Sequence, residues 1–340
     1  MKGLLRSARD SQIFWDLAGL AARLVPLASL KKLPNIIKFE STNLCNLSCP
    51  VCPTNFAITR EKGFLDFELF KKVIDEFKGM KKKPNVAFSM SGEPLLNRDI
   101  ARFVEYAHQS GHSTYISTNV TKLDRELSER LIRGGLSVIR LAIDGMSRES
   151  HEAYRIGSDF HQVKRNIEDF IKIKMELNSQ TPTAVIQTLL TAFSEREVDD
   201  MIQWASEIGA DQILFKSLSM GSYTDGKAKE AYSYLLPKNK RFLRRRNGVI
   251  KTLCRRPTIE TVVYWNGDLG LCCVDFNDAC QMPNIKERAF IETWRSKEVL
   301  VARKRGTLKQ YDLCKNCSLG HADYGGFSVQ LKSKSPSRLE

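Results

Sequence analysis

Three cysteines on one short loop carry the clearest chemical signal in this chain: Cys45, Cys49 and Cys52, spaced C-x3-C-x2-C. Three thiolates so close together can each ligate one iron of a [4Fe–4S] cube, which leaves the fourth iron without a protein ligand. An open metal position is typical of a site that performs chemistry. The alternatives are structural zinc and buried free thiols. Zinc prefers four closed ligands, which this run does not supply.

A second cysteine group follows two hundred residues later. The chain has nine cysteines, and none lies between Cys52 and Cys254. The second group comprises Cys254, Cys272, Cys273, Cys280, Cys314 and Cys317. No secretory signal is recognised, so clustered cysteines indicate metal ligands rather than disulfides.

The elements that position the first group alternate between strand and helix. Helical stretches with apolar residues at helical period, such as Leu69 to Phe77, separate the strand-like runs. Six such units predict an α/β fold with a parallel sheet, a partial (β/α)6 TIM barrel whose loops after the strands carry the chemistry. The predicted strands are 36–40, 86–90, 114–117, 138–143, 185–190 and 213–215.

The pattern predicts five segments along the chain. Residues 1–34 form an amphipathic helical segment, 35–217 the barrel, and 218–250 a basic connector. Residues 251–319 form a small cysteine-bearing domain with an Asn266-Gly267 hairpin turn. Residues 320–340 are polar and are expected to be disordered.

The bulk composition limits the partners. A net charge of +14 favours anionic partners but equally serves solubility. The apolar stretch 13–27 is interrupted by Asp16 and Arg23, so it is too short and too charged to span a bilayer. We expect it to pack across the barrel, with peripheral contact to a membrane surface as the second use. We expect a cytoplasmic protein, and without an aromatic-rich basic face we do not expect nucleic-acid binding.

A further motif makes the first cysteine loop recognisable. Ser91-Gly92-Glu93-Pro94 follows the second predicted strand. Together with the C-x3-C-x2-C loop and the six strands, it resembles the radical S-adenosylmethionine (SAM) superfamily, whose second motif is usually Gly-Gly-Glu-Pro. The resemblance implies that the open iron binds SAM, which is cleaved to methionine and a 5′-deoxyadenosyl radical. A flavodoxin or ferredoxin is the electron donor that it implies.

The resemblance also implies a set of SAM-binding residues. Ile143-Asp144-Gly145 resembles a Ser-x-Asp-Gly turn of the superfamily, although Ala142 stands at the serine position. Arg155 lies where related enzymes keep an arginine near the methionine carboxylate, and its alternative is a surface helix arginine. The predicted SAM-binding residues are Ser91, Gly92, Glu93, Pro94, Asn119, Asp144 and Arg155.

The second cysteine group resembles the SPASM and twitch extensions of that superfamily. There, such cysteines ligate an auxiliary [4Fe–4S] cluster. No cysteine follows Cys317, which resembles the single-cluster twitch arrangement of 2-deoxy-scyllo-inosamine dehydrogenase-like enzymes. The implied ligands are Cys254, Cys272, Cys314 and Cys317. The alternative is a four-cysteine zinc knuckle.

Three reactions are compatible with two clusters. The first is a two-electron oxidation of a small polar substrate, such as a sugar, an aminocyclitol or a phosphorylated derivative, with the auxiliary cluster accepting an electron. The second is redox-neutral epimerisation with Cys273 or Cys280 as hydrogen donor, and the third is modification of a peptide or protein. The predicted catalytic residues are Lys216, Asp275 and Cys280; Lys216 either holds an anion or acts as a base, and the alternative for each is a structural role.

Overall fold

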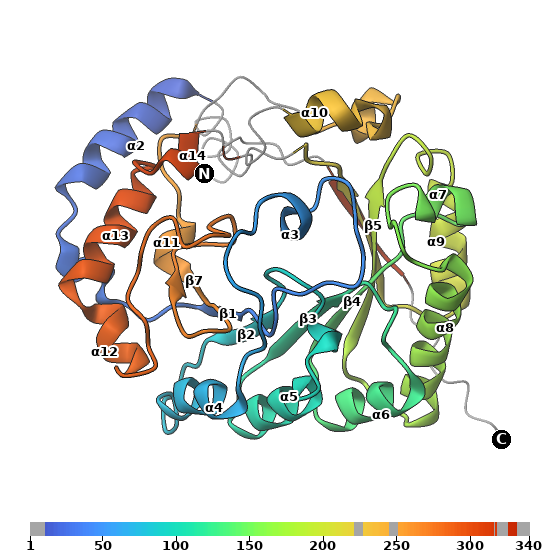
Figure 1. Cartoon of the computed structure of the whole chain (residues 1–340), viewed down its shortest axis with the longest axis horizontal. Coiled ribbons are helices and arrows are strands. Elements are labelled where there is room, and N and C mark those ends of the chain that lie inside the picture. The colour runs from blue at the N-terminus through green and yellow to red at the C-terminus, as the bar shows by residue number, and fades with distance from the viewer. Residues whose placement is uncertain (1–10, 221–226, 245–250, 316, 318–325, 332–340) are drawn as a thin grey trace, which may run out of the picture.

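A curved sheet with helices along its outer side forms the body of the molecule (Figure 1). The computed structural model describes residues 11–220, 227–244, 251–315, 317 and 326–331. Six parallel strands in chain order form the centre of the sheet: β1 (Ile36–Phe39), β2 (Asn85–Phe88), β3 (Thr114–Thr118), β4 (Val138–Ala142), β5 (Thr183–Leu190) and β6 (Gln212–Ser217). The predicted partial barrel is therefore confirmed.

Helices between these strands cover the outer face of the sheet. They are α4 (Phe67–Asp75), α5 (Ile100–Gln109), α6 (Arg125–Arg133), α7 (Arg148–Glu152), α8 (Phe160–Glu176) and α9 (Val198–Glu207). Asp66 caps α4 by accepting from the Glu68 and Leu69 amides, at 2.8 and 3.3 Å. Asp99 stands at the corresponding position before α5, but its side chain makes no bond to the first turn of that helix.

The core between helices and sheet is rich in phenylalanine. Phe39 of β1 and Phe70 of α4 pack edge to face, with ring centroids 4.8 Å apart. Phe70 and Phe103 of α5 lie at the same 4.8 Å separation. These rings are fully buried, so the first helices are fixed against β1 and β2, whose carboxyl ends carry the cysteine loop and the Glu93 turn.

The second cysteine group belongs to elements that extend the sheet beyond β1. Strand β7 (Glu260–Val263) pairs parallel with β1, and β8 (Leu269–Gly270) pairs antiparallel with β7 across the expected hairpin. The remaining elements of this region are α11 (Arg256–Ile259), α12 (Phe290–Arg295), α13 (Lys297–Thr307) and α14 (Asp312–Lys315). The auxiliary region is therefore continuous with the barrel sheet.

Part of the tail is ordered, against expectation. Residues Gly326–Gln330 form β9, which pairs antiparallel with β6. Phe327 stacks on Phe215, with centroids 4.7 Å apart, and on Phe242 at 6.2 Å. Disorder was predicted from polar composition, but two apolar residues at alternate positions are enough to hold this strand on an open sheet edge. Residues 320–325 and 332–340 lie outside the described residues.

The N-terminal helix does not pack across the barrel as expected. Helix α2 (Gln12–Leu24) has no buried residue, and it lies beside α13 (Figure 1). The Thr252 hydroxyl donates to the Trp15 carbonyl, and Lys304 Nζ donates to Arg23 O at 2.9 Å. Ile13, Leu17, Leu20 and Leu24 are between 61% and 82% exposed. Within the described ranges, no helix is long and apolar enough to cross a membrane.

The remaining short elements join these parts. They are η1 (Leu27–Lys31), α3 (Pro53–Phe56), η2 (Pro94–Leu96), α10 (Lys227–Tyr232), η3 (Ser233–Leu235) and η4 (Lys240–Phe242).

Candidate active site

A cavity of about 610 Å³ opens on the inner side of the barrel. Side chains from β1 to β7 line it, together with Cys45, Cys49 and Cys52. The predicted SAM-binding residues Gly92, Glu93, Pro94, Asn119 and Arg155 line it as well. The structure thus brings the first cysteine group and most of these residues together.

The cysteine loop is arranged for a metal group. The Leu47 amide lies 3.5 Å from Cys45 Sγ, and the Cys52 amide donates to the Cys49 carbonyl at 3.3 Å. Burial raises the pKa of the Cys49 thiol to about 11, while nearby Arg155 acts in the opposite direction. A thiolate here needs a strong positive neighbour, which an iron ion provides. The donor set therefore fits a cluster.

Gly92 and Glu93 fix the turn after β2 against the cysteine loop. Gly92 has φ 69°, and a Cβ there would lie 2.4 Å from Thr42 O and 2.5 Å from Leu44 O. The Glu93 amide donates to Leu44 O at 2.7 Å. A side chain at position 92 would therefore separate the turn from the loop.

Three donors hold the carboxylate of Glu93. Thr118 Oγ1 donates at 2.6 Å, the Asn119 amide at 2.7 Å and the Leu95 amide at 3.1 Å. Glu93 is almost completely buried, and this burial raises its pKa despite the three bonds. A cationic ligand at the cavity end of Glu93 would favour the charged form.

Asn119, at the end of β3, reaches the cysteine loop. Its Nδ2 donates to Asn46 Oδ1 at 3.1 Å and lies 3.9 Å from Cys45 Sγ. The next residue, Val120, is buried at φ 70°, which is uncommon for a β-branched residue. The Val120 amide donates to Thr118 Oγ1 at 2.9 Å. This bond stabilises the turn that places the Asn119 side chain beside Cys45.

Asp144 does not line the cavity but holds Arg155 in place. The Asp144 carboxylate accepts from Arg155 Nε at 2.5 Å and from the Leu189 amide at 2.7 Å, and it is fully buried. Arg155 lines the cavity near Cys49. Of the two predicted SAM-binding residues, Arg155 lines the cavity and Asp144 orients it. The alternative that Arg155 is a surface arginine is wrong.

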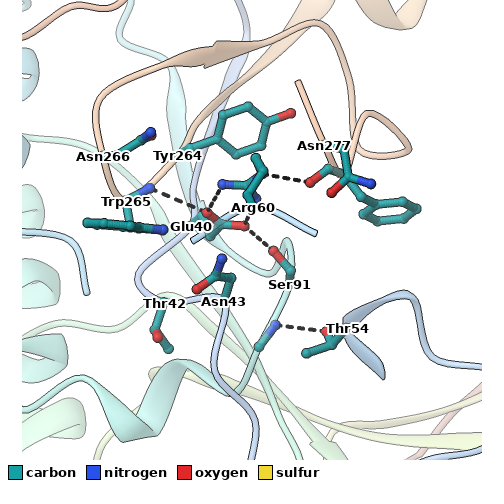
Figure 2. A network of polar contacts seen from close by, with 12 residues as sticks. Glu40, Thr42, Asn43, Thr54, Arg60, Ser91, Tyr264, Trp265, Asn266 and Asn277 are labelled. Carbon is teal, nitrogen blue, oxygen red and sulfur yellow. Dashed lines mark hydrogen bonds and ion pairs between the residues drawn. The ribbon is translucent and has the colours of Figure 1, made fainter. Parts of the chain in front are cut away.

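Ser91 turns away from the cavity into a buried polar network (Figure 2). Its hydroxyl donates to Glu40 Oε1. Glu40 is fully buried and also accepts two bonds from Arg60, at 2.6 and 3.1 Å. Arg60 Nε donates to the Phe276 carbonyl at 2.7 Å, and its guanidinium lies 4.0 Å from the Tyr264 ring centroid. The network joins the Glu93 turn to the segment after Cys272.

The predicted auxiliary ligands line one second cavity. These are Cys254, Cys272, Cys314 and Cys317, with Leu271 and Leu313 among the apolar residues around them. The Cys254 amide donates to Thr307 O at 2.8 Å, and the Cys317 amide to Cys314 O at 3.4 Å. Burial raises the pKa of the Cys314 thiol to about 11, so this set also fits a group that stabilises thiolates.

The two cavities share a wall. Arg256 lines both of them. Cys272 lines the second cavity, whereas the next residue, Cys273, lines the barrel cavity, with its sulfur 3.6 Å from Arg256 Nη1. One peptide bond thus separates an auxiliary thiol from the wall of the barrel cavity.

The predicted catalytic residues are not all together. Lys216 lines the barrel cavity, and burial together with Arg140 lowers its pKa to about 8. The buried Asp275 lies elsewhere and accepts from the Ala279 and Leu271 amides, at 2.8 and 3.2 Å, which is a structural arrangement. Cys280 lines a different cavity. The structure therefore does not bring Asp275 and Cys280 into the barrel cavity with Lys216. Tyr223, which follows the sixth predicted strand and could from its sequence position face the cavity, lies outside the described residues.

Sequence reasoning missed several polar residues of the cavity, among them two with unpartnered side-chain atoms. Arg140 of β4 and Gln187 of β5 line it, and each has a buried side-chain atom, Arg140 Nε and Gln187 Oε1, without a hydrogen-bond partner. The available signal was a polar residue in an otherwise apolar parallel strand, because such strands are usually apolar on both faces.

No group of three or more His, Cys, Asp or Glu residues in the described ranges is placed to hold a single metal ion. A [4Fe–4S] cube does not require such a group, because each cysteine binds a different iron of the cube.

Comparison with known proteins agrees with this geometry. Residues 39–205 match the radical SAM superfamily, and residues 254–318 match SPASM, an iron–sulfur cluster-binding domain. A curated relative, Fe-coproporphyrin III synthase of Methanosarcina barkeri, is 31% identical over 151 residues, 44% of this chain and 35% of that protein. The chain spans about a third to a half of the length of the first such relatives.

Two solved structures have a similar fold. BtrN in complex with AdoMet and 2-DOIA has a TM-score of 0.54 at 20% identity, covering 84% of this chain and 93% of that one. Streptococcus suis SuiB bound to precursor peptide SuiA has a TM-score of 0.60 at 14% identity, covering 81% of this chain and 68% of that one.

Proposed function

The chain belongs to the radical SAM superfamily and carries a C-terminal SPASM domain, and we propose that it oxidises a small polar substrate by two electrons. The substrate class is a sugar, an aminocyclitol or a phosphorylated derivative. When bound, the first cluster with SAM supplies a hydrogen-abstracting 5′-deoxyadenosyl radical, and the auxiliary cluster supplies an electron acceptor. The substrate loses one hydrogen atom, one proton and one electron in total.

The wall between the two cavities carries this proposal. Cys273 and Arg256 lie between the barrel cavity and the auxiliary thiols. A substrate in the barrel cavity is then close to both cysteine groups, which suits loss of an electron to the second group. The cavity of about 610 Å³ has the size of a small-molecule site.

Different residues of the barrel cavity are placed to bind different charged groups of SAM. Glu93, with its three fixed donors, offers its carboxylate to an ammonium group, and Arg155, held by Asp144, offers its guanidinium to a carboxylate. Both side chains are oriented before a ligand arrives, which lowers the entropic cost of binding.

The test is anaerobic reconstitution followed by iron counting and reductive SAM cleavage. We expect about eight irons per chain. Cys45→Ala abolishes SAM cleavage, whereas Cys314→Ala loses iron and keeps cleavage. The neighbouring pair provides a matched control: Cys272→Ala loses auxiliary iron, and Cys273→Ala keeps it. Four irons in the wild type, or cleavage unaffected by Cys45→Ala, would contradict the proposal.

Epimerisation is the second candidate, because a thiol lines the substrate cavity. Of the two predicted hydrogen donors, Cys273 lines this cavity and Cys280 lines another. In D2O an epimerised product gains one deuterium, and Cys273→Ala stops product formation while SAM cleavage continues. An oxidised product that forms equally well in Cys273→Ala excludes this candidate.

A further inference from the structure

The barrel cavity contains an imbalance of charge. Its lining includes five cationic side chains and two carboxylates, Glu93 and Glu260. Glu260 already pairs with Lys38 at 3.1 Å and with Arg256 at 2.9 Å. Glu93 already accepts from three donors, and among the described residues it forms no ion pair with these cations. The carboxylates present therefore do not balance the remaining cations.

Two of those cations form no ion pair with a carboxylate in the part of the chain that the structure describes. Arg155 is paired with Asp144 at 2.5 Å, which leaves Arg140 of β4 and Lys216 of β6. They are close enough that Arg140 disfavours the charged form of Lys216. An anion between them would remove this repulsion.

Unpartnered polar atoms mark the same region. Arg140 lies over the Tyr115 ring, 4.9 Å from its centroid, yet its buried Nε has no hydrogen-bond partner. Gln187, on the strand between Arg140 and Lys216, has a buried and equally unpartnered Oε1. Buried polar groups are normally bonded, and a ligand that accepts from Arg140 Nε and donates to Gln187 Oε1 would satisfy both atoms.

From these observations we propose that Arg140, Lys216 and Gln187 form the substrate-recognition site, binding an oxyanion and a neighbouring hydroxyl or amine. Arg140 and Lys216 donate to the carboxylate or phosphate of the substrate, and Gln187 Oε1 accepts from the hydroxyl or amine. This inference rests on the proposed function, since it names the substrate class for the same cavity.

The carboxylate of SAM is a second source of the same chemistry. Arg155 is the arginine whose charge acts on Cys45 and Cys49, so it lies nearer to the first cysteine group. Arg140 instead lies over the Tyr115 ring, and its charge acts on Lys216. This division assigns Arg155 to SAM and the Arg140–Lys216 pair to the substrate.

Equilibrium binding of inorganic phosphate and of acetate to the anaerobically reconstituted protein, with SAM present, tests the site. We expect Arg140→Gln and Lys216→Met each to weaken binding of the preferred anion by about tenfold or more. Arg140→Lys and Lys216→Arg retain the charge and should stay within about threefold. Lys172→Met, at an exposed position on α8, is the matched control.

The outcomes separate the possible sources. Preference for phosphate or for acetate identifies the oxyanion that the site binds. Either preference supports the proposal when Arg140→Gln and Lys216→Met bind the preferred anion more weakly than the wild type does. Binding unchanged in both variants overturns it, and so does a loss of SAM affinity equal to the loss of anion affinity. Wild-type protein that binds phosphate through Arg140 but never cleaves SAM contradicts the proposed function alone.

Discussion

Ser91 stands where the superfamily usually has the first glycine of its second motif, and its hydroxyl shows why a side chain suits this position. The Ser91 hydroxyl bonds to Glu40, away from the cavity. Gly92, in contrast, contacts backbone that leaves no room for a Cβ. Of the two positions, only the second needs glycine here, and the first has become part of the network around Arg60.

Removal of Arg60 should strongly destabilise the protein. In Arg60→Met, the fully buried Glu40 loses its cation, so we expect unfolding free energy to fall by about 3–5 kcal/mol. Urea denaturation of the reconstituted protein measures the change. The double variant Arg60→Met/Glu40→Gln should recover much of the loss, because no buried charge is then unpaired. Equal loss in the single and double variants would show that Arg60 acts through packing on Tyr264.

Anion binding should depend on pH through Lys216. Burial and Arg140 lower the pKa of Lys216 to about 8, while Arg155, Arg244 and Asp144 are its other charged neighbours. A bound anion raises that pKa, so affinity is constant below pH 8 and falls as the pH rises above it. Sulfate, which does not titrate in this range, is the probe.

The same measurement separates the two roles predicted for Lys216. In Lys216→Met the affinity for sulfate should be lower and should no longer change with pH. Affinity that does not change with pH in the wild type would mean that Lys216 does not bind the anion, which leaves the role of a base.

The first cysteine group and the Glu93 turn were predictable because each is a short motif that is local in sequence. Lys216 was predictable because it ends a strand. Arg140 and Gln187 were not, since facing the cavity depends on which side of each strand is inward, and burial on both faces hides this alternation. Asp275 was expected in the cavity because it closely follows the Cys272-Cys273 pair, yet its carboxylate accepts from the Leu271 and Ala279 amides instead. Cys280 was predicted only as a thiol left over from the auxiliary ligands, and it lines another cavity.

Among the elements, the six barrel strands were predictable from apolar runs and helical periodicity, whereas the pairing of β7 and β9 was not. Strand β7 was expected within a separate small domain, and it lies instead beside β1. Strand β9 has a polar composition, and its partner β6 is distant in sequence. Such pairings depend on which edge of the sheet is open in the folded protein. The local sequence pattern of a strand does not indicate which edge that is.

The ring of Phe327 should contribute most of the free energy that stabilises β9 on the edge of the sheet. We expect Phe327→Ala to lower the unfolding free energy by about 1–3 kcal/mol, because a partly exposed ring loses its stacking on Phe215 and Phe242. Ser328→Ala, on the exposed side of the same strand, is the matched control and should change little. Thermal denaturation of both variants provides the comparison, and equal stability would mean that β9 is held by its backbone bonds alone.

For the whole molecule, the continuous sheet implies that the cysteine-bearing C-terminal region cannot be removed cleanly. A chain that ends at residue 250 lacks β7, so the edge of β1 becomes free to pair with another chain. We expect this truncated chain to aggregate, whereas one that ends at residue 331 stays monodisperse. Size-exclusion chromatography distinguishes them, and a monomeric, folded 1–250 chain would show that β1 tolerates an open edge.

The order of the strands also has a consequence for how the protein is made. Strands β7, β8 and β9 cover the two ends of a sheet whose centre is β1 to β6, yet all three leave the ribosome after that centre. Cys45, Cys49 and Cys52 are therefore synthesised long before Arg256 and Cys273 complete the cavity wall beside them. During that interval the thiols lack the wall that Arg256 and Cys273 provide, so iron can reach them from a side that the finished chain covers.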